Sequence, residues 1–74
     1  MAGYLIEYNR RTGDWKVQEF AGPSGHQDAL RARLAKERSR TDTDIEIASI
    51  NGDSLETVKK THSRYFEGHE LLSA

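Results

Sequence analysis

Three histidines, His26, His62 and His69, are the residues of this sequence best suited to bind a metal ion. On a helix, the interval between His62 and His69 would cover about 10 Å of rise. Helical zinc ligands are normally one turn apart, so that both rings reach one ion. This spacing argues against a metal site, and the absence of cysteine excludes a Cys-based zinc site. We expect His62 at the edge of a helix–sheet contact and His69 in solvent.

A glycine-containing loop, Gly22-Pro23-Ser24-Gly25, precedes a predicted helix and could in principle hold a phosphate on free backbone N–H groups. The Gly-Lys-Ser/Thr end of a P-loop and the three spaced glycines of a dinucleotide-binding loop are both absent. We therefore interpret the loop as a strand-to-helix turn.

Nucleophiles and paired carboxylates give no catalytic pattern. No serine lies in a Gly-x-Ser-x-Gly elbow. The carboxylates fall mainly on one predicted strand and on helix surfaces, where nothing pairs two of them as acid and base. We predict that the chain is not an enzyme and uses no cofactor and no metal.

The charges nearly cancel, with 11 Lys and Arg against 12 Asp and Glu, but they are unevenly distributed. Basic residues dominate 29–41, whereas 42–56 holds acids and no base. The basic residues could follow a phosphate backbone. Alternatively, their stems cover the edge of the sheet, and the acidic segment neutralises them within the monomer or across a dimer. The aromatic residues could stack on bases, but we expect most of them in the core.

The elements that would position these residues begin with a hairpin. Residues 4–8 and 15–20 alternate as strands, and the polar segment 9–14 joins them. Phe20 is out of phase, which indicates either a bulge near Glu19 or packing of Phe20 at the end of the strand. A third strand is predicted at 44–50.

Two helices are predicted. The first runs from Ser24 to about residue 38, with a capping box to Gln27 and a narrow apolar stripe of Leu30 and Leu34 directed at the sheet. The second is capped by Asp53 or Ser54, and Gly68 would end it as a left-handed residue. Its apolar band holds Leu55, Val58, His62, Tyr65 and Phe66.

This order predicts an α+β fold: a small two-layer sandwich with β-β-α-β-α order and a three-stranded sheet carrying two helices on one face. The other sheet face would then be mostly polar, with Leu5, Glu7, Lys16 and Gln18. A right-handed crossover would place the third strand parallel to the second if the two are neighbours; an antiparallel third strand stays open. We expect one domain at 1–68 and a flexible tail at 69–74.

The function classes follow from composition. Without cysteine the chain is not a disulfide-stapled secreted scaffold, and no apolar run is long enough to span a membrane, so we expect a cytosolic protein that does not bind membranes. With 35% hydrophobic residues the core is marginal. This favours a non-enzymatic protein–protein interaction or accessory module, with a protein partner or a second copy as a homodimer. The alternative is a weak, non-specific nucleic-acid-binding protein. The candidate binding residues are Arg10, Arg11, Arg31, Arg38, Lys59 and Arg64.

Overall fold

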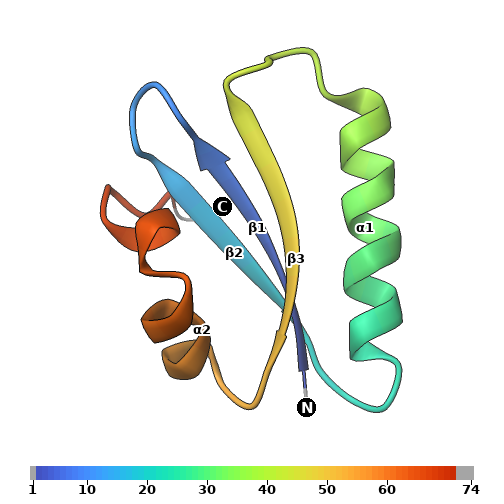
Figure 1. Cartoon of the computed structure of the whole chain (residues 1–74). Helices are drawn as coiled ribbons and strands as arrows, with labels where there is room; N and C mark the ends of the chain where they lie inside the picture. The colour runs from blue at the N-terminus through green and yellow to red at the C-terminus, as the bar shows by residue number, and fades with distance from the viewer. Residues whose placement is uncertain (1, 72–74) are drawn as a thin grey trace.

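Six elements follow one another along residues 2–71, the part of the chain that the computed structural model describes. They are β1 (Ala2–Asn9), β2 (Trp15–Phe20), α1 (Gly25–Ser39), β3 (Ile45–Gly52), α2 (Leu55–Thr61) and the short 3-10 helix η1 (Ser63–Phe66). Figure 1 shows the sheet between α1 on one side and α2 on the other. The predicted α+β class, the β-β-α-β-α order and the three-stranded sheet are confirmed.

The strand order in the sheet is β2-β1-β3, so that β1 is central. β1 pairs antiparallel with both neighbours. β2 and β3 therefore run in the same direction, but β1 separates them and they do not pair. The third strand instead pairs antiparallel with β1, the alternative that the sequence left open. The register from Tyr8–Trp15 to Gly3–Phe20 is unbroken, so there is no bulge near Glu19. Phe20 lies opposite Gly3 at the end of the strand, and opposed residues share one face of the sheet.

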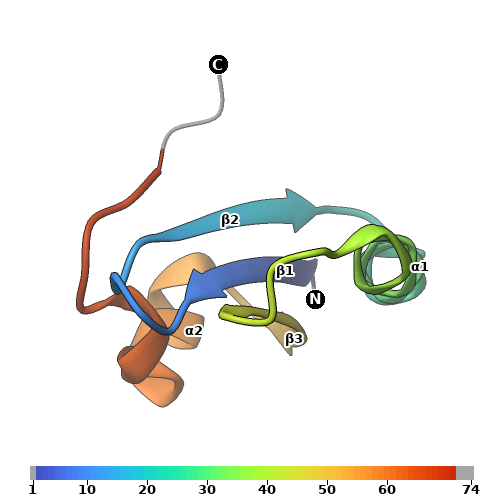
Figure 2. The same ribbon diagram turned by 90° about the horizontal axis from the view of Figure 1, so that it is seen from above.

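The two helices cover opposite faces of the sheet, and the prediction of both on one face is wrong (Figures 1 and 2). A Cβ atom on Gly3 would lie 2.8 Å from the Cβ atom of Ala29, which places α1 on the face of Gly3. Tyr4 and Ile6 point the other way and form the core cluster with Val58 of α2. The molecule has three layers, and the face expected to be polar lies under α1.

The helices lie on both faces of the sheet because the central strand, β1, is apolar on both of its faces. The consecutive residues Gly3, Tyr4, Leu5 and Ile6 are all buried, because β1 is covered on both faces. A continuous apolar run is what a strand buried on two faces requires, whereas a half-buried strand alternates. Leu5 and Ile47 are buried on the α1 side, and Tyr4 and Ile6 on the α2 side.

The predicted second helix is divided in two. α2 starts at Leu55, and the Oγ of its N-cap Ser54 accepts a hydrogen bond from the Thr57 amide. The helix ends at Thr61, whose hydroxyl bonds back to the carbonyl oxygen of Thr57, a competition that weakens helices. η1 then turns the Tyr65 ring against Tyr8, edge to face at 5.6 Å between ring centroids.

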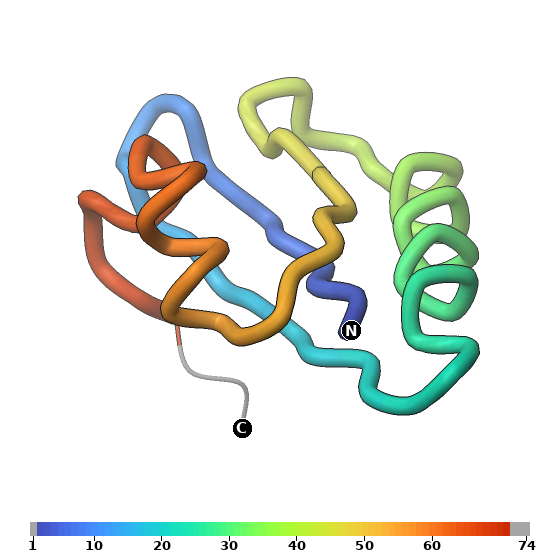
Figure 3. The backbone as a smooth tube through the Cα atoms, turned by 60° about the horizontal axis from the view of Figure 1, so that its bottom comes forward, coloured from blue at the N-terminus to red at the C-terminus, as the bar shows by residue number. Residues whose placement is uncertain are grey.

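The segment after η1 lies against the start of β2 (Figure 3). The amide of Trp15 donates to the carbonyl oxygen of His69, and Leu71 donates to the carbonyl oxygen of Trp15. Of the tail expected at 69–74, residues 72–74 lie outside the described part. Gly68 does not have the predicted left-handed conformation; positive φ occurs only at Gly13 and Gly22 within residues 2–71. Gly68 is instead in close backbone contact with Gly13, where a Cβ atom would overlap the Gly13 carbonyl group.

Candidate functional site

α1 approaches the sheet with its small residues and leaves its leucines in solvent. Gly25 and Ala29 are buried against the sheet, and Ala32 and Lys36 follow on the same side of the helix at 3.6-residue spacing. Leu30 is 39% exposed and Leu34 is 51% exposed. The predicted stripe of Leu30 and Leu34 against the sheet is therefore wrong: Gly3 and Gly25 allow a backbone approach that leaves no room for large side chains.

β3 has one free edge. Within residues 2–71 it pairs with β1 alone. The carbonyl oxygen of Asp44 accepts from the Arg10 amide and so faces β1. Backbone groups alternate in direction along an antiparallel strand. Hence Ile45, Ile47, Ser49 and Asn51 direct their N–H and C=O groups outward.

Only the first of these four outward residues is satisfied by neighbouring groups. The Ile45 amide donates to the carbonyl oxygen of Asp42, and the Ile45 carbonyl accepts from the Arg40 guanidinium at 2.8 Å. In the described part of the chain, no hydrogen bond reaches the outward backbone groups of Ile47, Ser49 or Asn51. These three residues form a short stretch of strand edge whose backbone groups are unpaired.

Of the exposed leucines of α1, Leu30 lies on the same side as this strand edge, and Leu34 lies next to Leu30 toward solvent. His26 bonds to the side chain of Asn51 at 2.7 Å between Nδ1 and Oδ1, which identifies the helix flank that borders β3. Leu30 is one turn further along that flank, and Leu34, one turn beyond Leu30, is rotated about 80° from His26 toward the solvent side of the helix. We call the set of Leu30, Leu34, Ile47, Ser49 and Asn51 the α1–β3 surface. Arg33 and Glu37, paired at 2.9 Å, are also on this flank.

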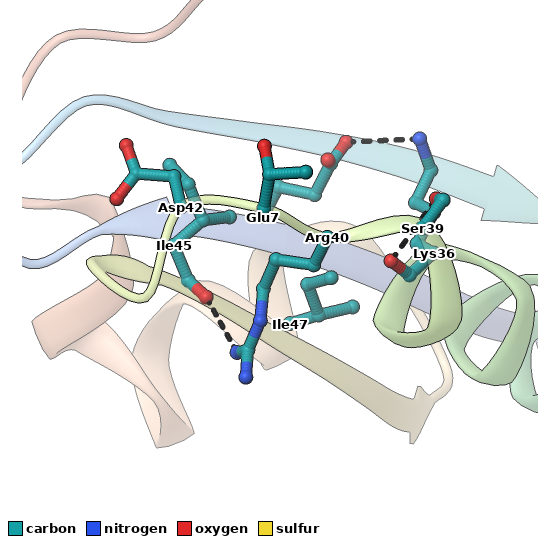
Figure 4. Close-up of a pocket in the computed structure, with 8 residues that line it drawn as sticks. Glu7, Lys36, Ser39, Arg40, Asp42, Ile45 and Ile47 are labelled. Carbon is teal, nitrogen blue, oxygen red and sulfur yellow. Dashed lines mark hydrogen bonds and ion pairs between the residues drawn. The ribbon is translucent and has the colours of Figure 1, made fainter.

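A groove of about 260 Å³ lies between the end of α1 and the start of β3 (Figure 4). Ile45 and Ile47 contribute apolar lining, and Glu7 crosses the groove to Lys36 at 3.4 Å. The Glu7 carboxylate also meets Lys16 at 3.6 Å. No buried side-chain polar atom in residues 2–71 lacks a partner. The Glu7 carboxylate therefore links α1 to the sheet through its ion pairs with Lys36 and Lys16.

The candidate cations at the hairpin tip pair with acids of the β3 side. Arg11 lies 3.7 Å from Asp44, and Arg10 lies 4.0 Å from Glu46. The Arg64 guanidinium donates to Glu46 at 2.8 Å. The basic residues of 29–41, which the acidic segment was expected to neutralise, have other ion-pair partners in the described part of the chain: Arg33 pairs with Glu37 and Lys36 with Glu7.

The remaining three candidate cations are separated. Lys59 lies over the Trp15 ring, 5.2 Å from its centroid. Arg31 and Arg38 are exposed on α1, round the helix from the β3 flank. Because α1 and α2 cover opposite faces, the six residues do not form one basic surface.

Glu46 is the centre of the strongest polar cluster. It accepts hydrogen bonds from Tyr65 and Arg64, and these bonds hold η1 on the sheet. The hydrogen bond from Tyr65 is the main cause that lowers the pKa of Glu46, with the nearby arginine charges adding to it against an opposing effect of burial. Burial and the Glu46 carboxylate raise the pKa of Tyr65. Sequence analysis missed this cluster, since its partners are far apart in the chain.

The other predicted sites are not assembled. His62 is exposed, with its ring bonded to the adjacent Thr61. No group of three potential metal ligands occurs within residues 2–71. Ser24 is the N-cap of α1 as predicted, but the capping box is not formed; its hydroxyl bonds to Asp28 instead. None of the helices in the described segment is long and apolar enough to cross a membrane.

Comparison with known proteins gives no relative: no protein-family model, no curated protein and no solved structure matches this chain.

Proposed function

We propose that this chain is a small cytosolic protein–protein interaction module without catalytic activity, which binds its partner along the α1–β3 surface. The observation that supports this proposal is an unpaired strand edge directly beside two exposed leucines. An open edge offers N–H and C=O groups that accept an added strand. The leucines supply the apolar area that backbone pairing alone lacks.

The distribution of charge favours a protein partner over a nucleic acid. A phosphate backbone is bound by many cations on one continuous surface. Arg10, Arg11 and Arg64 already face acids in this chain, and Lys59 lies on the opposite side of the sheet from α1. The residues of the α1–β3 surface are uncharged, and the cations beside it are already engaged: Arg33 pairs with Glu37, and Arg40 donates to the carbonyl oxygen of Ile45.

Photo-crosslinking tests the location of the partner. We would place p-benzoylphenylalanine at position 34 and, as a matched control, at position 35, which is also exposed but on the flank of α1 away from β3. Crosslinked species would be identified by mass spectrometry, and the identified partner would be purified. It would then be titrated into labelled protein, and amide shifts would be mapped.

The proposal predicts crosslinks from position 34 and few from position 35. With the purified partner it predicts amide shifts at Ile47, Ser49 and Asn51 that disappear in Leu34→Lys. Equal crosslinking from both positions, crosslinks to nucleic acid alone, or shifts centred on Arg10 and Arg11 would each overturn it.

A further inference from the structure

We infer that the partner on the α1–β3 surface is a second copy of this chain, joined by antiparallel pairing of two β3 edges about a two-fold axis at Ser49. This inference rests on the proposed function and specifies its partner. It creates a continuous six-stranded sheet with the order β2-β1-β3-β3-β1-β2. The two α1 helices lie side by side on one face of that sheet.

The backbone of β3 is complementary to itself in one register. The outward backbone groups of Ile45 already form hydrogen bonds with Asp42 and Arg40. Among the outward residues of β3, Ile47, Ser49 and Asn51 therefore have backbone groups left to pair with a second strand. An antiparallel pair uses all three when Ser49 faces Ser49 of the second copy and Ile47 faces Asn51. Each such pair exchanges two hydrogen bonds, about six in total. If the strands slide by two residues in either direction, only two pairs between unpaired residues remain. The third residue would then face Ile45, whose groups are already bonded, or a residue beyond the end of β3.

The same axis brings the leucines together. α1 runs antiparallel to β3: Ala29 lies near Gly3, whose β3 partner is Asn51, and Lys36 lies near Glu7, whose partner is Ile47. Ser49 is therefore level with the middle of that span, between Leu30 and Leu34. A two-fold rotation about Ser49 brings the Leu30 flanks of the two α1 helices alongside each other, with Leu34 at the solvent margin of the contact. A two-fold interface must complement itself in this way.

Charge also favours a second copy as the partner. On a two-fold interface, each unbalanced charge near the axis meets its own copy, which is unfavourable. The residues that define the α1–β3 surface are all uncharged, and the neighbouring Arg33 is paired with Glu37 on the same helix. Arg31 lies round the helix away from β3, and Arg38 borders Leu34 on the solvent side of the helix, away from the strand edge.

A disulfide trap tests the axis directly. The chain has no cysteine, so Ser49→Cys introduces a single thiol. Directly opposed residues of a hydrogen-bonded antiparallel pair have Cα atoms about 5.5 Å apart, within the range of roughly 4.4–6.8 Å that a disulfide spans. Ser24→Cys is the matched control, because Ser24 is exposed and lies outside the surface. We expect Ser49→Cys to oxidise to a covalent dimer at least tenfold faster than Ser24→Cys.

Sedimentation velocity over a concentration series, with three variants, tests the contacts. Ser49→Pro removes an outward N–H group that the monomer does not use, and proline is accepted on edge strands. We expect it to keep the dispersed amide spectrum of the fold and to weaken the dimer about 10- to 100-fold, from two lost hydrogen bonds. Leu34→Lys should also weaken dimerisation, and Ala35→Lys should not.

The outcomes separate this inference from the proposed function. A wild-type protein that sediments as a monomer at all concentrations, with equal oxidation of both cysteine variants, overturns the dimer. If position 34 still crosslinks to a different polypeptide, the interaction module stands with another partner. If neither experiment detects a partner, both proposals fail.

Discussion

Gly3→Ala tests whether the close approach of α1 to β1 governs the stability of this fold. An added Cβ atom would lie 2.4 Å from the carbonyl oxygen of Gly25 and 2.8 Å from the Cβ atom of Ala29. Neither neighbour can rotate away, because one is backbone and the other is a methyl group fixed to the helix. The helix must therefore move outward. We expect a loss of about 2 kcal/mol in the free energy of unfolding, as in other overpacked cores.

The opposite sign is expected if the approach is not tight. In open space, replacing a strand glycine by alanine stabilises a protein by about 0.5–1 kcal/mol. Urea unfolding followed by Trp15 fluorescence distinguishes the two cases, because Trp15 is the only tryptophan and is 5% exposed. A loss of about 2 kcal/mol lowers the melting temperature by roughly 8–16 °C.

Gly52→Ala is the matched control for Gly3→Ala. Its Cβ atom would have one contact under 3 Å, at 2.8 Å from Cγ2 of Val58, whereas the Cβ atom on Gly3 would have three, two of them to backbone atoms of Gly25. We therefore expect Gly52→Ala to lose less stability than Gly3→Ala. A Gly3→Ala variant as stable as wild type would refute the packing argument.

Three further predictions concern charge. The pKa of Glu46 is lowered in the folded state, so its contribution to stability is complete above pH 4.5 and is lost as the pH falls through the folded value. Urea titrations should show that lowering the pH from 7 to 3 decreases the free energy of unfolding by about 1–2 kcal/mol less in Glu46→Gln than in wild type. An equal decrease in both proteins contradicts this role. The pKa of Tyr65 is raised, so the stability linked to it is present below pH 10 and declines as the pH rises through the folded value, a decline that Tyr65→Phe should reduce. Short RNA and duplex DNA should cause few amide shifts at Arg10, Arg11 or Arg64 at low salt, because acids already neutralise these residues; strong shifts that fade with salt would restore the nucleic-acid alternative.

Local signals in the sequence predicted the elements well. The alternation of Trp15 and Val17 defined β2, whose observed bounds match the prediction, and Ser24 and Ser54 marked the helix starts. These features depend on a few neighbouring residues, so they can be read without the fold. The pairing of Arg10 and Arg11 at the hairpin tip with Glu46 and Asp44 was not predicted, because it depends on β3 lying beside β1.

The placement of the helices could not be obtained from hydrophobicity alone. Leu30 and Leu34 are the most apolar residues of α1, yet the helix turns Gly25 and Ala29 to the sheet. The usable signals were the small residues 25, 29 and 32 at helical spacing and the continuous run of Tyr4, Leu5 and Ile6. The α1–β3 surface depends on the strand order, which no local pattern specifies.

The central position of β1 also governs how the chain acquires its fold during synthesis. β1 leaves the ribosome before both of its neighbours, and its second neighbour, β3, follows roughly 2–9 s later at ordinary translation rates. During that delay β2 covers one edge of β1. Leu5 is not covered until α1 packs on one face, and Tyr4 and Ile6 are not covered until α2 packs on the other. Because both layers and the last strand must arrive before this strand is enclosed, no shorter piece that ends before β3 has a complete sheet. Residues 4–6 are therefore incompletely covered until α1, β3 and α2 have all been synthesised.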